Sequence, residues 1–579
     1  MKGFITEKSE YPNPAFIRDD IEILDGIWRF TFDDANQMEK GGINNINFSA
    51  NINVPFCYQS QLSGISTDET HENMWYNRTF TVTKEQLDGE VLLHFGAVDF
   101  RAKVWVNDQF VGQHEGGNTP FMFEIADFLS VGENQITIKA EDSYSKEQPR
   151  GKQMWGKDVM MCWYTNTSGI WQSVWLEFTG RNYIKSIRIT PDIDNNQARF
   201  VIRVKNETNI SLKVVLNKEN ECLGEMMVTP HDGKAELLYT FREYVVRAQK
   251  ELWWSPGHPN LIDVEVILFE NGIEVDKVDT YFGMRKIHTS EDRIYLNNQE
   301  FYQRLVLDQG YWPDSMMTPP SGEALKKDVE LTKKMGFNGV RKHQKIEDPR
   351  YYYWADKLGL VVWGELPSAY DFTPDSRKRQ MDEMWAFIQR DYNHPCIINW
   401  VPVNESWGIW EAMDNEQQQH FIRTLYYMIK AEDTTRLVVG NDGWEQIHTT
   451  DICAIHDYAI TPKNAKERYA DIFELLKGSV NSKPIYANNY SYNGVPILLT
   501  EMGGVKLENT DGWGYANEMH DENEMINYLR TIIEEIRKCP YIRGFCYTQL
   551  TDVMQETNGL LSANREPRAN MDILREIFG

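Results

Sequence analysis

The sequence predicts a multidomain protein in which a jelly-roll β-sandwich and an immunoglobulin-like β-sandwich precede a (β/α)8 TIM barrel. The chain has 579 residues, which is too long for one hydrophobic core and indicates two to four domains. Short alternating strands bounded by Gly, Asn and Asp dominate up to about residue 290, without a sustained helical period. Beyond that point apolar runs alternate with amphipathic helices, as in parallel β/α units.

Two β domains are expected before the barrel. The runs IWRFTF (27–32) and WQSVWLEFTG (171–180) alternate in character and are bounded by turn residues, which favours a sandwich or jelly roll over residues 1–181. A second set of short strands begins with IKSIRITPDI (184–193). It has the size of one immunoglobulin-like sandwich, which we expect over residues 182–287.

The barrel is expected over residues 288–579. Helical segments such as EALKKDVELTKKM and DENEMINYLRTIIEEIRK separate its apolar runs, and eight strands in this length satisfy the (β/α)8 pattern. Because parallel strands share one carboxyl-end face, their polar ends predict one polar mouth. The eight runs are FYQRLVLD (301–308), GFNGVRKH (336–343), LGLVVWGEL (358–366), CIINWVPVN (396–404), TRLVVGND (435–442), DICAIHDY (451–458), VPILLTE (495–501) and IRGFCYTQL (542–550).

Two of these apolar runs lead into a glutamate. INWVPVNESWG (398–408) contains Glu405, and VPILLTEMGG (495–504) contains Glu501. Each glutamate could cap its strand or pair with a helix cation. Two carboxylates at the same barrel face, however, are typical of a retaining glycoside hydrolase, in which one protonates the leaving oxygen and the other attacks the anomeric carbon.

The ordered set of motifs resembles glycoside hydrolase family 2 over essentially the whole chain. That family contains β-galactosidases, β-glucuronidases and β-mannosidases, and its members combine a sugar-binding jelly roll, an immunoglobulin-like domain and a barrel. The motifs that carry the resemblance are LDGIWRF (24–30), VWVNDQFVGQHEGGNTPF (104–121), TSGIWQSVWLE (167–177), FGMRKI (282–287), GFNGVR (336–341), DYNHPCIINWVPVNES (391–406) and PILLTEMGG (496–504).

The resemblance implies a role for each glutamate. By the family's pattern Glu405 is the acid/base and Glu501 the nucleophile, with the carboxyl groups about 5–5.5 Å apart and a covalent glycosyl-enzyme intermediate. Like charge and burial would raise the pKa of Glu405. Formation of the glycosyl ester removes the charge of Glu501 and would let Glu405 act as a base in the second step.

Further substrate-binding residues follow from the resemblance and from strand-end positions. Asn404 matches an amide that binds the sugar 2-hydroxyl, Arg341 an arginine that holds the nucleophile ionised, and Tyr458 a tyrosine that hydrogen-bonds the nucleophile. His456 could contact the sugar or be a satisfied core histidine. The remaining candidates are Asp308 and His343 for sugar hydroxyls, and Trp407, Trp410, Trp444 and Trp513, which could stack on a sugar or belong to the core.

Three departures from the family's pattern concern metal and substrate. The best-known β-galactosidases keep a Glu and a His after the third strand that together bind magnesium, and GELPSAYDF (364–372) has no such pair. We therefore predict no metal and no cofactor. Family β-glucuronidases carry an Asn-x-Lys element that binds the sugar carboxylate, and the matching residues 556–558 have no lysine. This difference argues against uronic acid as the glycone, although an Arg or Lys from another loop could bind the carboxylate. An Asn-Ala-Lys occurs at 464–466, but it lies in the helix expected after the sixth strand, so we attribute its match to this element to chance. Tyr547 occupies the place of a tryptophan that faces the sugar, which argues against ordinary galactoside specificity.

The predicted function is a retaining exo-β-glycosidase that acts on a small-molecule or oligosaccharide glycoside, with a β-galactoside-like glycone favoured. A β-hexuronidase (glucuronidase or galacturonidase) or a β-mannosidase is the alternative within this class. A transglycosidase would share the first step but exclude water from the second. A non-catalytic carbohydrate-binding protein would be expected to lack one of the two carboxylates.

Charge and cysteine usage restrict the partners and the compartment. The formal net charge of −26 argues against nucleic acid and anionic membranes as partners. Seven cysteines without a C-x-x-C pair argue against a disulfide framework and for a reducing compartment. Since the first residues lack an apolar signal region and no run of 18 apolar residues occurs, we expect a cytoplasmic protein. The family often assembles through its β domains, so a homo-oligomer is compatible with the resemblance.

Overall fold

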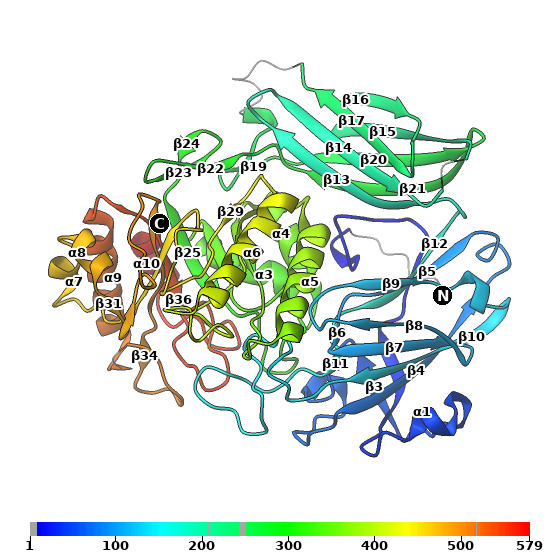
Figure 1. The fold of residues 1–579 in the computed structure, drawn as a ribbon, viewed down its shortest axis with the longest axis horizontal. Helices are drawn as coiled ribbons and strands as arrows, with labels where there is room; N and C mark the ends of the chain where they lie inside the picture. The colour runs from blue at the N-terminus through cyan, green and yellow to red at the C-terminus, as the bar shows by residue number, and fades with distance from the viewer. Residues whose placement is uncertain (1–7, 207, 220, 243–249, 517) are drawn as a thin grey trace.

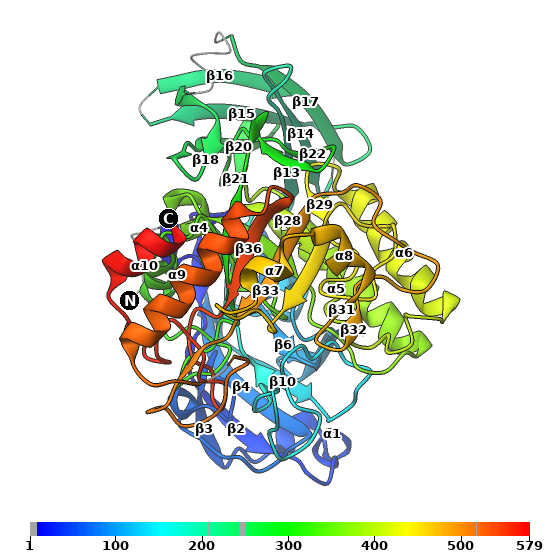
Figure 2. The ribbon, with the colours of Figure 1, turned by 90° about the vertical axis from the view of Figure 1, so that its left-hand side faces the viewer.

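The computed structural model describes residues 8–206, 208–219, 221–242, 250–516 and 518–579. It contains two β-sandwiches and a barrel, so the predicted fold class is confirmed (Figure 1). Figure 2 shows the immunoglobulin-like sandwich above the barrel and the jelly roll below it. Among the described residues no helix is both long and apolar enough to span a bilayer.

The N-terminal sandwich packs two antiparallel sheets face to face. Alternate residues of their strands point inward, and the core includes Trp28, Phe30 and Tyr76. One sheet has the order β1-β12-β5-β9 and the other β3-β2-β4-β10-β7-β8. The strands are β1 (Ile21–Ile23), β2 (Gly26–Phe32), β3 (Ala50–Val54), β4 (Asn73–Val82), β5 (Glu90–Phe95), β7 (Arg101–Val106), β8 (Gln109–Glu115), β9 (Phe121–Glu124), β10 (Gly132–Glu141) and β12 (Val174–Thr179), with β6 (Val98–Asp99) and β11 (Gly169–Ile170) paired separately and a short helix α1 (Met38–Gly41).

The second sandwich follows the same period of two. In β15 the residues Ile210, Leu212, Val214 and Leu216 are buried, and the residues between them are partly exposed. Its sheets have the orders β13-β14-β17 and β16-β15-β20-β21. The strands are β13 (Ile184–Asp192), β14 (Gln197–Val204), β15 (Ile210–Lys218), β16 (Glu221–Val228), β17 (Lys234–Thr240), β20 (Ile262–Glu270) and β21 (Ile273–Phe282), followed by the small sheets β18 (Trp254–Ser255) with β19 (His258–Pro259), and β22 (Ile287–Ser290), β23 (Arg293–Leu296) and β24 (Gln299–Glu300).

All eight predicted barrel runs form strands of one parallel sheet. Its order is β29-β28-β27-β26-β25-β36-β33-β30, so the strands neighbour one another as in a (β/α)8 barrel. Both faces are covered, which explains why the runs are almost continuously apolar. The strands are β25 (Gln303–Asp308), β26 (Gly339–Lys342), β27 (Val361–Glu365), β28 (Ile397–Val401), β29 (Leu437–Val438), β30 (Cys453–Asp457), β33 (Ile497–Gly503) and β36 (Ile542–Thr548).

Amphipathic helices surround this sheet. In α9 the buried residues include Met525, Leu529, Ile532 and Ile536, which lie on one stripe with the period of a helix. Figure 2 shows α9 and α10 on one side of the barrel and α5 and α6 on the other. The helices are α3 (Gly322–Lys334), α4 (Pro349–Leu358), α5 (Pro374–Asp391), α6 (Glu416–Glu432), α7 (Ala465–Arg468), α8 (Ile472–Lys477), α9 (Glu522–Lys538) and α10 (Met571–Phe578), with two small strand pairs, β31 (Ser479–Val480) with β32 (Lys483–Pro484) and β34 (Lys506–Leu507) with β35 (Glu518–Met519).

A segment of the N-terminal domain crosses to the barrel. We name residues 146–168 the arm; Figure 1 shows this cyan segment leaving the sandwich and running beside the barrel. Arg150 N donates to Ser368 O at 2.9 Å, and Gln555 Nε2 donates to Met161 O at 2.8 Å. The arm is therefore bonded to the loops that follow the third and eighth barrel strands.

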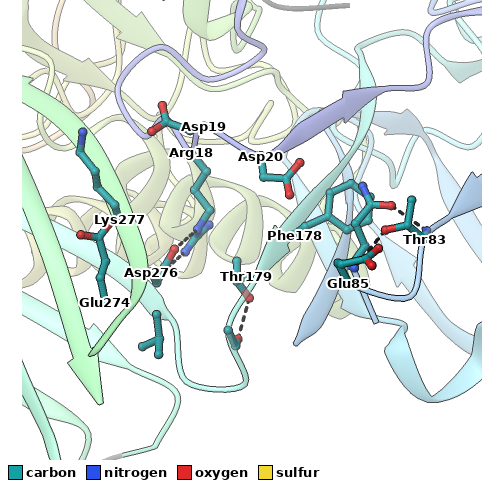
Figure 3. Close-up of a pocket in the computed structure, with 13 residues that line it drawn as sticks. Arg18, Asp19, Asp20, Thr83, Glu85, Phe178, Thr179, Glu274, Asp276 and Lys277 are labelled. Atoms are coloured by element: carbon teal, nitrogen blue, oxygen red, sulfur yellow. Dashed lines mark hydrogen bonds and ion pairs between the residues drawn. The ribbon is translucent and has the colours of Figure 1, made fainter. Parts of the chain in front are cut away.

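A buried arginine ties the two β domains together. Arg18 donates to Asp276 Oδ1 at 2.9 Å and to Glu177, and Asp276 also accepts from Ile184 N. Figure 3 shows Arg18 directed at Asp276 beside a cavity of about 620 Å³ between the two domains. Burial alone would raise the pKa of Glu177, but the charges of His94 and Arg18 lower it below its ordinary value.

We predict that Arg18→Met destabilises the protein by about 3–5 kcal/mol, because the change leaves buried carboxylates without their cation. Urea unfolding at neutral pH measures this loss. The matched control is Arg199→Met, whose pair with Glu236 is more than half exposed on the arginine side and should cost less than about 1 kcal/mol. Equal effects of the two substitutions would show that Arg18 is not a structural tie.

Candidate active site

A buried arginine organises the polar mouth of the barrel. Arg341, in β26, has no solvent exposure. Its guanidinium donates to Glu365 Oε2 (2.7 Å), Glu501 Oε1 (2.9 Å) and Asn404 Oδ1 (2.7 Å). It also lies 3.3 Å from Asp442 Oδ2. A buried cation is costly unless it is paired, and here three carboxylates and an amide oxygen supply the partners.

Glu501 lies in β33 among hydrogen-bond donors and positive charges. Its Oε2 accepts a hydrogen bond from the Tyr458 hydroxyl at 2.6 Å and lies 3.5 Å from His456 Nδ1. Burial alone would raise the pKa of Glu501, but the charges of His456 and Arg341 and the Tyr458 hydrogen bond lower it. The side chain is 6% exposed. Glu501 is therefore an ionised carboxylate beneath the mouth.

Glu405 follows β28 at a sharp turn. Its φ is +52° and that of Ser406 is +57°, in the left-handed region that non-glycine residues seldom adopt. The Glu405 N–H donates to Asp442 O at 2.8 Å, which fixes the turn. Burial and the negative charge of Glu501 raise the pKa of Glu405, although its hydrogen bond with His456 opposes them.

The two glutamates approach each other closely. One oxygen of Glu405, one oxygen of Glu501 and one ring nitrogen of His456 lie within 4.8 Å of one another. So close an approach of two carboxylate oxygens fits a retaining pair, whose carboxyl groups stand about 5–5.5 Å apart. Since their pKa values are moved in opposite directions, Glu405 holds a proton more readily than Glu501 does.

His456 belongs to this cluster through both ring nitrogens. Its Nδ1 lies 2.7 Å from Glu405 Oε1, and its Nε2 lies 3.2 Å from Asp442 Oδ1. Burial would lower the pKa of His456, but the charge of Glu501 and the hydrogen bonds of Asp442 and Glu405 raise it to about 10. His456 therefore contacts the proposed acid/base directly, and a contact between His456 and the sugar stays a prediction.

Asn404 keeps one unpartnered donor at the mouth. Arg341 binds its Oδ1, which fixes the orientation of the amide, whereas its buried Nδ2 has no hydrogen-bond partner among the described residues. A buried donor without a partner points to a bound group that is absent here. The amide is thus positioned to donate to a ligand hydroxyl.

The two remaining hydroxyl-binding candidates differ in position. His343 lies in the cluster: its Nδ1 is 2.9 Å from Glu365 Oε1 and 4.0 Å from Glu501 Oε1. Asp308 is fully buried, and its oxygens bind Lys342 Nζ at 2.6 Å and the N–H of Gly310 at 2.8 Å. The structure therefore places Asp308 in an internal ion pair and outside the catalytic cluster.

The expectation that Tyr547 faces the sugar is wrong. Its ring is buried against Phe578 of α10 (ring centroids 5.7 Å apart), so it points to the helix layer. The next residue, Thr548, faces the site, and its hydroxyl lies 2.9 Å from the Tyr458 hydroxyl. Side chains alternate along a strand, so a one-residue difference in position reverses the face.

Two of the four candidate tryptophans lie beside histidines of the cluster. The rings of Trp407 and Trp444 lie 6.1 and 5.5 Å from the two histidines of the site. Trp513 lies in a barrel loop and donates from Nε1 to the arm at 3.1 Å. Trp410 is 50% exposed and lies further out. Flat apolar surface is therefore available on several sides of the mouth.

Several residues of the mouth were not predicted as site residues. Glu365 and Asp442 had a sequence signal, because each ends a predicted barrel strand. The others come from loops and from the arm, where no periodic pattern marks them. They are Lys152, Gln309 and Tyr515, which contact Glu556, and Asn558, which is connected to Gln309 through Gln549.

Comparisons with known proteins agree with this architecture. Family models match the sugar-binding domain of glycosyl hydrolases family 2 at residues 21–179, its central domain at 182–285 and its TIM barrel domain at 291–579. A β-galactosidase from Thermoanaerobacter pseudethanolicus is 26% identical over 399 residues, covering 66% of this chain and 51% of the relative. The β-glucuronidase of Mus musculus is 22% identical over 641 residues, covering 100% and 93%.

A solved structure shows the same fold. The β-glucuronidase from Ruminococcus gnavus in complex with D-glucuronic acid superimposes with a TM-score of 0.79 at 18% identity, covering 99% of each chain. Matches to the bacterial relatives span about half of their length, 49% and 51% in two cases. The three family models together cover nearly all of the chain. The chain belongs to family 2 of the glycosyl hydrolases.

Proposed function

We propose that this protein is a retaining exo-β-glycosidase that works by double displacement. The observation that carries the proposal is the close pair of Glu405 and Glu501, whose pKa values are shifted in opposite directions. The spacing matches the two-carboxylate mechanism with a covalent intermediate. The proposed reaction needs no metal ion or cofactor, because carboxylates supply both the nucleophile and the proton.

In the first step Glu501 attacks the anomeric carbon. A bond forms between a Glu501 oxygen and that carbon, while the bond from the carbon to the aglycone oxygen breaks. Glu405 gives its proton to the departing oxygen, so the aglycone leaves as a neutral alcohol. Arg341 and Tyr458 orient the attacking carboxylate through their contacts with its two oxygens.

In the second step water replaces Glu501. The ester carries no charge on Glu501, so the repulsion that raised the pKa of Glu405 is gone and Glu405 can accept a proton from water. The oxygen of that water forms the new bond to the anomeric carbon, and the bond to Glu501 breaks. The anomeric configuration is retained because it is inverted twice.

Asn404 and the covered mouth support specificity for one terminal sugar. The free Nδ2 of Asn404 is proposed to donate to a hydroxyl next to the reacting carbon, a bond that strengthens as positive charge develops. The arm is bonded at Met161 to Trp513 and to Gln555, which lie in two different barrel loops at the mouth. A pocket closed on this side favours removal of single terminal residues over cleavage within a chain.

The glycone is a further part of the proposal. A β-galactoside-like glycone is the one that the sequence favours, and β-hexuronides are the alternative; the relatives named above include both kinds of enzyme. A carbohydrate-binding protein without activity is disfavoured, because both carboxylates and their orienting partners are present. Added alcohol acceptors would separate a transglycosidase from a hydrolase.

We predict that Glu501→Gln lowers kcat/KM for aryl β-glycosides by more than about 10³-fold, because an amide cannot form the glycosyl ester. Wild-type protein treated with a 2-fluoro aryl glycoside should gain the mass of one sugar, located on the peptide that contains Glu501. The control is Glu508→Gln, an exposed glutamate nearby. A label on another residue would contradict the assignment.

We predict that Glu405→Ala slows alkyl glycosides more than activated aryl glycosides, because a good leaving group departs without protonation. The expected loss is about 10²–10⁴-fold for the alkyl substrates. Azide should restore part of the rate by entering the vacated space and yielding a β-glycosyl azide. A uniform loss without rescue by azide would contradict the role of Glu405 as acid/base.

We predict that His456→Asn moves both limbs of the pH profile of kcat/KM to higher pH. Activity requires ionised Glu501 and protonated Glu405. The charge of His456 lowers the pKa of both glutamates, so its removal raises both pKa values. The control is His520→Asn on the surface. Unchanged limbs would show that His456 is neutral in the free enzyme.

A further inference from the structure

The arm delivers a buried lysine to the barrel mouth. The side chain of Lys152 is 3% exposed. Its ammonium lies over the ring of Trp407 at 5.6 Å and over that of Tyr164 at 5.5 Å. Trp407 follows Glu405 by two residues, so the amine from the N-terminal domain stands beside the loop that carries the proposed acid/base.

The ammonium of Lys152 is only loosely paired. Its ion pair within 4.0 Å among the described residues is with Glu556 Oε2 at 3.8 Å, which is longer than a hydrogen bond. Glu556 is already engaged by Tyr164, by Gln309 at 3.0 Å and by Tyr515 at 2.8 Å. Burial raises the pKa of Glu556 to about 7, so this carboxyl neutralises Lys152 only in part at neutral pH.

A chain of side-chain contacts connects Lys152 with the proposed nucleophile, Glu501. Tyr515 binds Glu556 and stacks on Tyr458 with ring centroids 4.2 Å apart, and the Tyr458 hydroxyl donates to Glu501. The charge of Lys152 also lowers the pKa of Glu405, which places the amine near the proposed acid/base. Nearby, buried Gln309 Oε1 and Asn558 Nδ2 have no partner among the described residues, which leaves one acceptor and one donor for a ligand.

Burying an ammonium without a close anion is costly, and the catalytic reaction gives no reason for it. Arg341 and His456 form the ion pairs with the carboxylates of the cluster, and Lys152 has none with them within 4.0 Å among the described residues. With a neutral sugar the nearest carboxylate to Lys152 stays Glu556 at 3.8 Å, whereas a sugar carboxylate could approach to hydrogen-bond distance. We propose that Lys152 binds the carboxylate of the glycone, so that this protein's substrates are β-hexuronides; this rests on the proposed glycosidase function.

Two readouts test the proposal. The first is the ratio of kcat/KM for p-nitrophenyl β-glucuronide and β-galacturonide over the β-galactoside. The second is calorimetric binding of free D-galacturonate, D-glucuronate and D-galactose, which does not depend on turnover. Wild type should prefer at least one uronate in both readouts. In Lys152→Met this preference should fall by about 30- to 100-fold, the value of a buried charge-assisted hydrogen bond, and mainly through KM.

Two further variants separate charge from packing. Lys152→Arg keeps the charge and should retain part of the uronate preference. Lys146→Met changes an exposed lysine of the same arm, whose amine lies over Trp155, and should leave the preference as it is. Thermal unfolding reports whether each variant folds. If Lys152→Met and Lys152→Arg weaken uronate and galactose equally, Lys152 positions the mouth and the proposal is overturned.

The outcomes distinguish this inference from the proposed function. A sugar ester on Glu501 with the neutral 2-fluoro glycoside, together with wild-type preference for galactose over both uronates, would overturn the role of Lys152 and leave the glycosidase intact. An absence of any ester on Glu501 with neutral and uronic donors alike would overturn the glycosidase itself. Uronate preference that depends on Lys152 supports the inference.

Discussion

The catalytic mouth depends on one buried guanidinium. Arg341 has no access to water, so it must be satisfied by protein groups, and those groups are the ends of neighbouring barrel strands. It binds Glu365 after β27, Asn404 after β28 and Glu501 in β33, and lies beside Asp442 after β29. One cation therefore sets the positions of the nucleophile candidate and of the amide that we propose binds the sugar.

Glu405 and Glu501 have different proposed roles because their surroundings differ. Glu501 has Arg341, protonated His456 and the Tyr458 hydroxyl as partners, which favours its ionised form. Glu405 is buried beside that negative charge, and these two effects favour its protonated form against the opposing contact with His456. The difference is electrostatic, because both are glutamates with the same ordinary pKa. The negative charge that raises the pKa of Glu405 would be lost when Glu501 becomes an ester, and Glu405 could then act as the base of the second step.

The barrel does not form its mouth alone. The N-terminal sandwich, held to the second domain by Arg18, sends its arm across the barrel, where Lys152 and the aromatic residues around it complete one wall. Lys152 of this wall lies 253 positions before Glu405 in the sequence (405 − 152). We expect the choice of glycone to depend on this wall, because a fold alone does not fix the substrate.

The sequence by itself determined the eight barrel strands and the two β-sandwiches, because burial on one or both faces imposes a local period on the residues. It also predicted Glu405 and Glu501 from their positions at strand ends, and the family resemblance added Asn404, Arg341 and Tyr458, which the structure brings together with them. Only the tertiary structure decided that Tyr547 faces the helices, that Asp308 is paired with Lys342, and that Lys152 reaches the mouth. Successive side chains of a strand point to opposite faces, so a shift of one residue at a strand end reverses the face to which a side chain points. Contacts between distant segments depend on how the domains pack, and domain packing produces no periodic pattern in the sequence.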